Sequence, residues 1–309
     1  MREESRLWGC AVGAAIGDAL GMPLEFGPQR PADRLVREMR PGRLPAGSFT
    51  DDTEMALALG ESLLANCPLN PGDLAERFVR WYRAGPDDIG VHLGKVLSRI
   101  SQGEAWAAAA GAVQAQYPEA AGNGSVMRCW PAALAHWDDL PGLLADSRLQ
   151  SSVTHAHPEC VAGSALVNAI IYFLVRSATP HEAVAQALDA VHDVPTGLRQ
   201  AVEAAPSRLR TELKNSGWVR ETVESAVWGL LTTNSFEEAV IQVANLGNDA
   251  DTAAAVAGAL AGAAYGLEAI PQQWRETLRG ELPWQRGRVW RTEDLVQLAN
   301  RLAQAEGQA

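Results

Sequence analysis

The sequence predicts an all-α protein. Apolar residues recur at helical spacing in Ala-rich segments, the two-residue alternation typical of strands is nearly absent, and Pro and Gly mark the joints between segments. Together these features favour helices joined by short turns. Such helices are expected at residues 55–66, 73–84, 159–175, 181–191, 220–231 and 235–244.

Glycines at four-residue intervals indicate two further helices, one near each end of the chain. The two sets are Gly9, Gly13, Gly17 and Gly21, and Gly258, Gly262 and Gly266. Four-residue spacing places each set on one helical face, where the missing side chains let another backbone approach closely. We therefore expect two helices in a crowded core that bring distant loops together.

Two segments break the helical pattern. Residues 27–49 are rich in Pro, Gly and Arg, and residues 102–123 run into a Gly-rich turn, so both are expected to be irregular. Loops of this length in a compact domain often carry function.

Size and charge limit the possible classes of protein. The chain has 309 residues, 47% of them hydrophobic, which suits one large domain spanning residues 1–309. The net charge of -11 argues against nucleic acid as a partner, because such surfaces neutralise phosphates with Lys and Arg. The longest uncharged run, residues 252–267, is short and rich in Ala and Gly, so we expect a buried helix and no membrane partner.

The termini and cysteines favour a cytoplasmic protein. Acidic residues follow Met1 where a secretory signal would carry basic ones. The four cysteines are far apart, with no Cys-x-x-Cys pair to suggest a zinc knuckle or a redox pair.

A first acidic cluster lies just before the predicted helix at residues 55–66. Thr50, Asp51, Asp52 and Glu54 are nearly consecutive there, and one of these polar residues is expected to cap the helix. Capping would explain a lone Asp, but this many polar groups exceed what one cap requires.

A second acidic cluster leads into the second glycine helix. Asp249 and Asp251 are two residues apart, so in an extended approach their carboxylates would point to the same side. Like charges that are partly buried cost several kcal/mol per ion, whereas a helix N-terminus returns only about 0.3 to 1 kcal/mol. A divalent cation with oxygen ligands, Mg²⁺ or Mn²⁺, would balance them.

Two more acids lie at the end of the first glycine helix. Asp18 is expected to cap or brace a neighbouring helix end. Glu25, after Pro23 and at the mouth of the irregular segment, is the better functional candidate.

Three polar turns complete the candidate residues. Residues 122–125 offer backbone amides at a helix start, where an anion could bind, although Asn-Gly is also a common turn. His155 and His157 open a helix and lack a further nitrogen or sulfur ligand nearby, so packing is the more frequent role for such a pair. The first interpretation of residues 86–90 is a turn between helices.

Six motifs in order resemble the ADP-ribosylglycohydrolase family, most closely its dinitrogenase reductase-activating branch. The matching segments are residues 13–21, 49–55, 86–90, 122–128, 154–158 and 247–252, and the resemblance extends from residue 13 to about residue 266. The family's Asp-x-Gly-Asn pattern reads Asp88-Ile89-Gly90-Val91 here, so this chain departs from it at the Asn.

The resemblance implies a compact orthogonal bundle of helices around two Mg²⁺ or Mn²⁺ ions. One ion would be held by Thr50, Asp51, Asp52 and Asp251, and the other by Asp249, Asp251 and Thr252, with Asp251 as the bridge. Gly122, Asn123, Gly124 and Ser125 would approach the diphosphate, and His157 would lie near the ribose that bears the linkage. Asp88 and Glu25 would be the catalytic acids. Tyr117, Trp130 and Trp106 are candidates to stack on adenine.

By this resemblance the expected function is removal of ADP-ribose from a modified protein or a small-molecule conjugate. Arginine is the preferred linkage, because a carboxylate such as Asp88 can pair with a leaving guanidinium and handle its proton. Three alternatives stay open: a serine- or other O-linked ADP-ribose hydrolase, a two-metal nucleotide phosphohydrolase, and a non-catalytic ADP-ribose binder.

Overall fold

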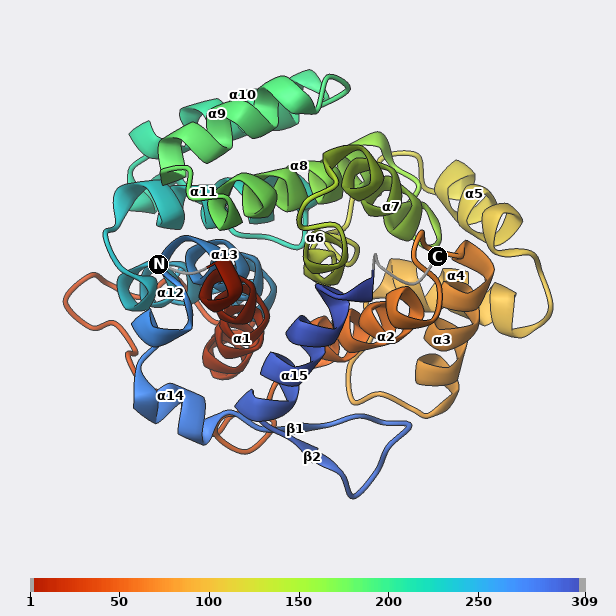
Figure 1. Cartoon of the computed structure of the whole chain (residues 1–309), viewed down its shortest axis with the longest axis horizontal. Helices are drawn as coiled ribbons and strands as arrows, with labels where there is room; N and C mark the ends of the chain where they lie inside the picture. Colours follow the sequence, from red (N-terminus) through yellow and green to blue (C-terminus); the bar gives the residue numbers. More distant parts are fainter. Residues whose placement is uncertain (1–2, 306–309) are drawn as a thin grey trace.

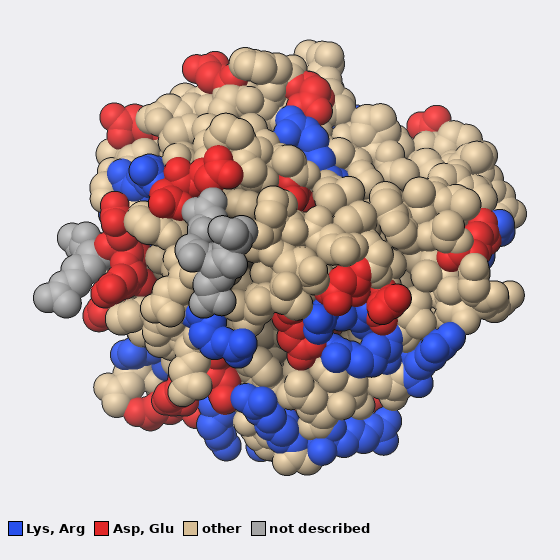
Figure 2. Space-filling view, turned by 45° about the vertical axis from the view of Figure 1, so that its right-hand side comes forward, with Lys and Arg blue, Asp and Glu red and all other residues tan. Residues whose placement is uncertain are grey.

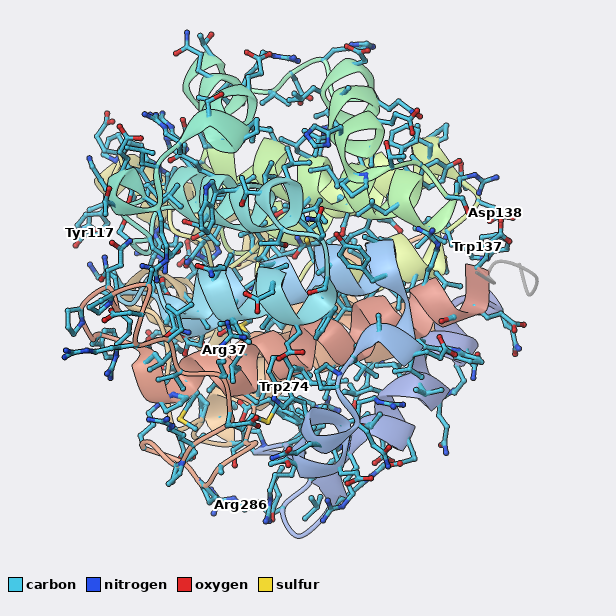
Figure 3. All side chains as sticks on the ribbon, turned by 90° about the vertical axis from the view of Figure 1, so that its left-hand side faces the viewer. Arg37, Tyr117, Trp137, Asp138, Trp274 and Arg286 are labelled. Atoms are coloured by element: carbon cyan, nitrogen blue, oxygen red, sulfur yellow. The ribbon has the colours of Figure 1, made fainter. Side chains whose placement is uncertain are left out.

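Two long helices from opposite ends of the chain form the centre of the fold. In the computed structural model, which describes residues 3–305, α1 (Glu3–Gly21) and α13 (Ala250–Tyr265) lie side by side (Figure 3). A Cβ atom added at Gly17 would lie 1.9 Å from the carbonyl oxygen of Ala254, and one at Gly258 would lie 2.0 Å from that of Gly13. The two predicted glycine sets therefore face each other, and only glycine allows this backbone contact.

The remaining helices surround this pair (Figure 1). On one side lie α2 (Asp51–Ala65), α3 (Pro71–Arg83), α4 (Val91–Ser101), α5 (Trp106–Gln116), α6 (Trp130–Ala135), α7 (Leu140–Ser152) and α15 (Thr292–Leu302). On the other lie α8 (Pro158–Val175), α9 (Pro180–Ala190), α10 (Thr196–Ala204), α11 (Val219–Thr232), α12 (Phe236–Ala244) and α14 (Gln272–Thr277). One hydrophobic core, from Leu7 to Leu302, runs through both groups.

Short elements connect these helices. They are the 3₁₀ turns η1 (Met22–Leu24), η2 (Ala205–Ser207), η3 (Arg210–Glu212) and η4 (Leu267–Ala269), and the antiparallel pair β1 (Gly280–Glu281) and β2 (Val289–Trp290). The prediction of an all-α fold is thus confirmed for the described residues.

Two described segments are long and apolar enough to cross a membrane, Glu3–Leu24 and Pro158–Val175. Their most apolar windows are 89% and 78% buried inside the protein, respectively. This burial is the pattern of core helices.

One of the two predicted irregular segments is partly helical. Residues 27–49 contain no helix, as expected, but residues 102–123 include α5. The helix is rich in alanine, the strongest helix former, and it buries only Ala109, Ala110 and Val113. Its apolar face is too narrow to stand out as a helical pattern in the sequence.

Candidate active site

The acidic clusters meet in one cavity of about 360 Å³ at the end of the α1–α13 pair. Gly21, the last glycine of α1, lies against the backbone of Asp251, since a Cβ there would be 2.4 Å from the Asp251 Cα. The close helix contact therefore fixes where the second acidic cluster stands. The acids that line the cavity are Glu25, Asp51, Asp52, Asp88, Asp249 and Asp251.

The start of α2 is capped by an acid from another helix. Thr50 is the N-cap residue, but its side chain makes no capping hydrogen bond to α2, so the expectation of a cap from within this cluster is wrong. Asp18 of α1, fully buried, accepts hydrogen bonds from the backbone N–H groups of Thr50 and Thr53 and from both hydroxyls. The predicted bracing role of Asp18 is confirmed, and it locks α2, with Asp51 and Asp52, to α1.

The second acidic cluster lies on a helix start rather than on an extended strand. Asp249 is the N-cap of α13, and Asp251 lies within its first turn. The strand-like argument for their common direction is therefore wrong, although both side chains do line the cavity. Asn123 holds one of them in place, because its amide nitrogen donates to Asp249 Oδ2 at 2.8 Å and to Thr222 Oγ1 at 2.9 Å.

Glu25 reaches the cavity through a tight crossing of two loops. Phe26 N–H donates to the carbonyl of Asn248, and Asn248 N–H donates to that of Gly27. Gly247 has φ +69, and a Cβ there would lie 2.5 Å from Gly27 O, so the crossing requires glycine. One oxygen each of Glu25, Asp249 and Asp251 can be chosen so that all three lie within 4.8 Å of one another.

Burial and mutual repulsion make these carboxylates reluctant to ionise. Burial, followed by the charges of Asp52 and Glu25, raises the pKa of Asp251 well above its usual value. Burial also raises the pKa of Glu25, although the guanidinium of Arg43 opposes that shift. A cluster with such shifts in a cavity is typical of a functional site that binds cations.

The acid excess of the chain is partly internal. On the face shown in Figure 2, acidic and basic side chains are interspersed, and Lys and Arg gather in its lower part. Asp18, Asp52 and Asp251, by contrast, are each at most 3% exposed. Part of the net charge of -11 therefore comes from buried acids at the cavity rather than from the surface.

Several predicted site residues line this cavity and others do not. Gly122, Asn123, Gly124 and Thr252 line it beside the acids. The Thr50 hydroxyl is bonded to Asp18. The fully buried Ser125 hydroxyl accepts a hydrogen bond from Ser151 and does not line the cavity.

Two histidines, His92 and His155, line the cavity, whereas His157 caps α8. His157 Nδ1 accepts a hydrogen bond from Glu159 N–H and lies outside the cavity lining. His155 lies under the turn at Gly124, where a Cβ would be 3.0 Å from His155 Nε2. Arg128 Nη2 donates to Thr154 Oγ1, and the Thr154 hydroxyl is hydrogen-bonded to His155 Nδ1 at 2.8 Å. Burial lowers the pKa of His155 well below its usual value, which favours the neutral imidazole.

The aromatic candidates for adenine stacking lie away from the cavity. Trp130 is 2% exposed, Trp106 lines a different groove, and the Tyr117 ring is covered by Lys95 Nζ at 3.7 Å. Figure 3 shows Tyr117 at the edge of the molecule. None of the three lines the acidic cavity.

Sequence reasoning missed His92 and Phe26, which line this cavity, and Trp218, which follows the lining residue Gly217. Phe26, 81% exposed, lines the cavity. Trp218 is 40% exposed, and its backbone bridges Gly122. Arg220 covers one face of the Trp218 ring at 4.4 Å, and Glu159 accepts from its indole N–H at 2.8 Å. The signal available in the sequence was a tryptophan that follows Gly217.

Arg43 is another residue that the sequence did not indicate. It comes from the irregular segment 27–49 and extends toward the cavity acids. Its Nη1 lies 3.1 Å from Glu25 Oε2, and its Nη2 lies 3.2 Å from Asp88 Oδ2.

Comparison with known proteins finds one family model and several similar chains. The family model described as ADP-ribosylglycohydrolase matches residues 1–309. The ADP-ribosylarginine hydrolase Tri1 of Serratia proteamaculans is 35% identical, covering 87% of this chain and 74% of that protein. The ADP-ribosyl-[dinitrogen reductase] glycohydrolase of Rhodospirillum rubrum is 34% identical, covering 89% and 90%. A solved structure titled ADP-ribosylglycohydrolase-related protein complex superposes with a TM-score of 0.82 at 33% identity, covering 98% of this chain and 99% of that one.

Proposed function

The chain belongs to the ADP-ribosylglycohydrolase family and is a hydrolase, and from that premise we propose that it uses two divalent metal ions to release ADP-ribose from modified arginine. The observation that carries this proposal is the meeting of six acids, from four separate segments, in one cavity. The expected targets are ADP-ribosylated proteins or small conjugates in the cytoplasm, without nucleic acid or membrane as partners.

The donor set suits Mg²⁺ or Mn²⁺. All the candidate ligand atoms are carboxylate or hydroxyl oxygens, and Asp52 Oδ1 is buried without a hydrogen-bond partner among the described residues. The residues that would hold the ions are Thr50, Asp51, Asp52, Asp249, Asp251 and Thr252. When bound, the ions would supply Lewis acidity for the ribose and lower the pKa of a water.

Asp88 and Glu25 have the placement for proton transfer. Asp88 is 37% exposed and pairs with the guanidinium of Arg43, which supports a role for this position in binding a substrate arginine. Glu25 is 11% exposed, and its raised pKa favours a carboxyl group that holds a proton and releases it again. We assign proton transfer with the arginine leaving group to Asp88 and proton transfer with the attacking water to Glu25.

The rest of ADP-ribose would extend along the turn at residues 122–124. Backbone there lines the cavity, which suits a diphosphate, and His155 Nε2 lies beneath it. Trp218 would stack on adenine, because one face of its ring is already covered by Arg220 while 40% of the residue is exposed.

Substrate comparison with one acid removed tests the proposal. Asp88→Asn should lower kcat on ADP-ribosylarginine by about 100-fold, the usual scale for a general acid or base, with little effect on binding of free ADP-ribose. Asp87→Asn is the matched control, because Asp87 is the adjacent acid but does not line this cavity. Both rates would be measured by chromatography of the released products with saturating Mn²⁺.

The same assay separates the alternatives. Faster turnover of serine-linked substrate would replace the arginine assignment with an O-linked one. Release of AMP or inorganic phosphate would indicate a nucleotide phosphohydrolase. ADP-ribose binding without any product would indicate a binding protein.

A further inference from the structure

Arg43 places a cation among the acids of the candidate metal site. Besides Glu25 and Asp88, it approaches Asp251, with Nη2 at 3.6 Å from Asp251 Oδ2. The three acids come from three separate segments, and Asp251 is only 3% exposed. The Arg43 side chain itself is 30% exposed, so it enters the cavity from the solvent side.

The segment that carries Arg43 is fixed at both ends. Val36 exchanges backbone hydrogen bonds with the Asn245 side chain, and Ser48 forms an isolated bridge with Arg279. Between these anchors, residues 40–43 are exposed. This exposure leaves room on the solvent side for the Arg43 side chain to turn away from the acids while both anchors stay in place.

We propose that Arg43 is the resident counter-ion of the metal-free cavity and is displaced when a divalent ion binds Asp251. The inference rests on the proposed two-metal function. A divalent ion on Asp251, the expected bridging ligand, would compete with Arg43, because two cations close to one buried carboxylate repel each other. Displacement also frees Asp88, which the substrate guanidinium needs. Metal binding thus opens the arginine subsite and couples residues 37–47 to the state of the metal site.

Calorimetric titration with Mn²⁺ in the absence of substrate tests the competition. Arg43→Met should bind Mn²⁺ roughly tenfold more tightly than the parent, because the metal no longer has to displace the resident cation. Arg34→Met is the matched control: it removes the same charge from the same segment, but Arg34 is 80% exposed and pairs with Asp33. It should stay within about twofold of the parent, since exposed charges are screened by salt.

Hydrogen exchange of the parent protein gives a readout that needs no variant. Mn²⁺ should speed the exchange of residues 37–47, and Arg43→Met should exchange fast with or without metal. Equal Mn²⁺ affinities for Arg43→Met and Arg34→Met, or parental exchange that Mn²⁺ leaves unchanged, would overturn the displacement alone. Absence of Mn²⁺ binding would overturn both the displacement and the two-metal function. Displacement of Arg43 by Mn²⁺ without turnover of ADP-ribosylarginine would refute only the proposed function.

Discussion

The contact between α1 and α13 and the acidic cavity at its end use the same two helices in opposite ways. Along the contact, glycines let the backbones touch, and any side chain added there meets a carbonyl oxygen. At the end, the same helices bring buried acids together, where burial raises the pKa of Asp18, and burial and repulsion raise that of Asp251. The contact therefore stabilises the fold, whereas the metal-free cavity costs stability in return for function. Substitutions in the two regions should change the free energy of unfolding with opposite signs.

The largest effect is expected in the helix contact. Gly17→Ala should lower the free energy of unfolding by about 4 kcal/mol, near the top of the range for point substitutions. The added Cβ would lie 1.9 Å from a backbone oxygen of α13, which cannot rotate away as a side chain could. Urea unfolding measures the change, and a loss below about 1 kcal/mol would show that the helices can separate at little cost.

A buried acid with its own partner should behave differently from the cavity acids. Asp146 lies 2.7 Å from His136, and both are at most 3% exposed. Burial alone lowers the pKa of His136, but hydrogen bonds with Asp146 and Cys67 outweigh it and raise the pKa to about 10. Asp146→Asn should therefore destabilise the protein by about 3 kcal/mol, since it removes the carboxylate that lies 2.7 Å from this buried charge.

The pH dependence of that loss follows from the raised pKa. The stabilisation by charged His136 is fully present below its unfolded pKa of about 6.5 and is lost as the pH rises through about 10. Unfolding of the parent and of Asp146→Asn at pH 6 and pH 10 should show a difference that shrinks at the higher pH. A constant difference would mean that the hydrogen bond to Leu69 N–H, rather than the charge, is what Asp146 contributes.

Removal of a cavity acid should raise stability while abolishing function. Asp251→Asn should increase the free energy of unfolding of the metal-free protein by roughly 0.5–2 kcal/mol, a usual gain for a stabilising substitution. It should also remove both metal ions and activity while helical content stays intact. Unfolding in EDTA, metal analysis and circular dichroism check the three parts. A destabilised variant, or one that keeps its rate, would contradict the contrast between the two regions.

The smallest effect is expected at a glycine outside the contact. Gly111, in α5, has nothing within 4 Å of an added Cβ. Gly111→Ala should stabilise by about 0.5–1 kcal/mol, because alanine loses less backbone entropy in a helix. The same urea unfolding should show changes of opposite sign in the free energy of unfolding for Gly17→Ala and Gly111→Ala. This difference would separate the effect of the helix contact from that of helix propensity. A loss at Gly111 would remove that distinction.

Local patterns in the sequence predicted the helices and the acids, but not the partners that those acids meet. The four-residue glycine spacing predicted the close helix contact, because the period of a helix is fixed by its own geometry. Arg43 gave no such signal, since the path of segment 27–49 depends on distant contacts such as that between Val36 and Asn245. Trp218 likewise gave no such signal, since its place beside the lining residue Gly122 depends on a backbone bridge across 96 positions (218 − 122). Asp18 was predicted as a brace, but which helix it braces depends on packing.

The two hydrogen bonds from the Asn123 amide also bear on how the protein ages. An Asn followed by Gly is prone to lose ammonia when the next backbone nitrogen attacks the side-chain carbonyl carbon. Here hydrogen bonds to Asp249 and Thr222 restrict rotation of the amide, and Asn123 is only 8% exposed. The contacts that orient an acid of the candidate site therefore also slow this damage, which would otherwise set a carboxylate against Asp249 during long storage.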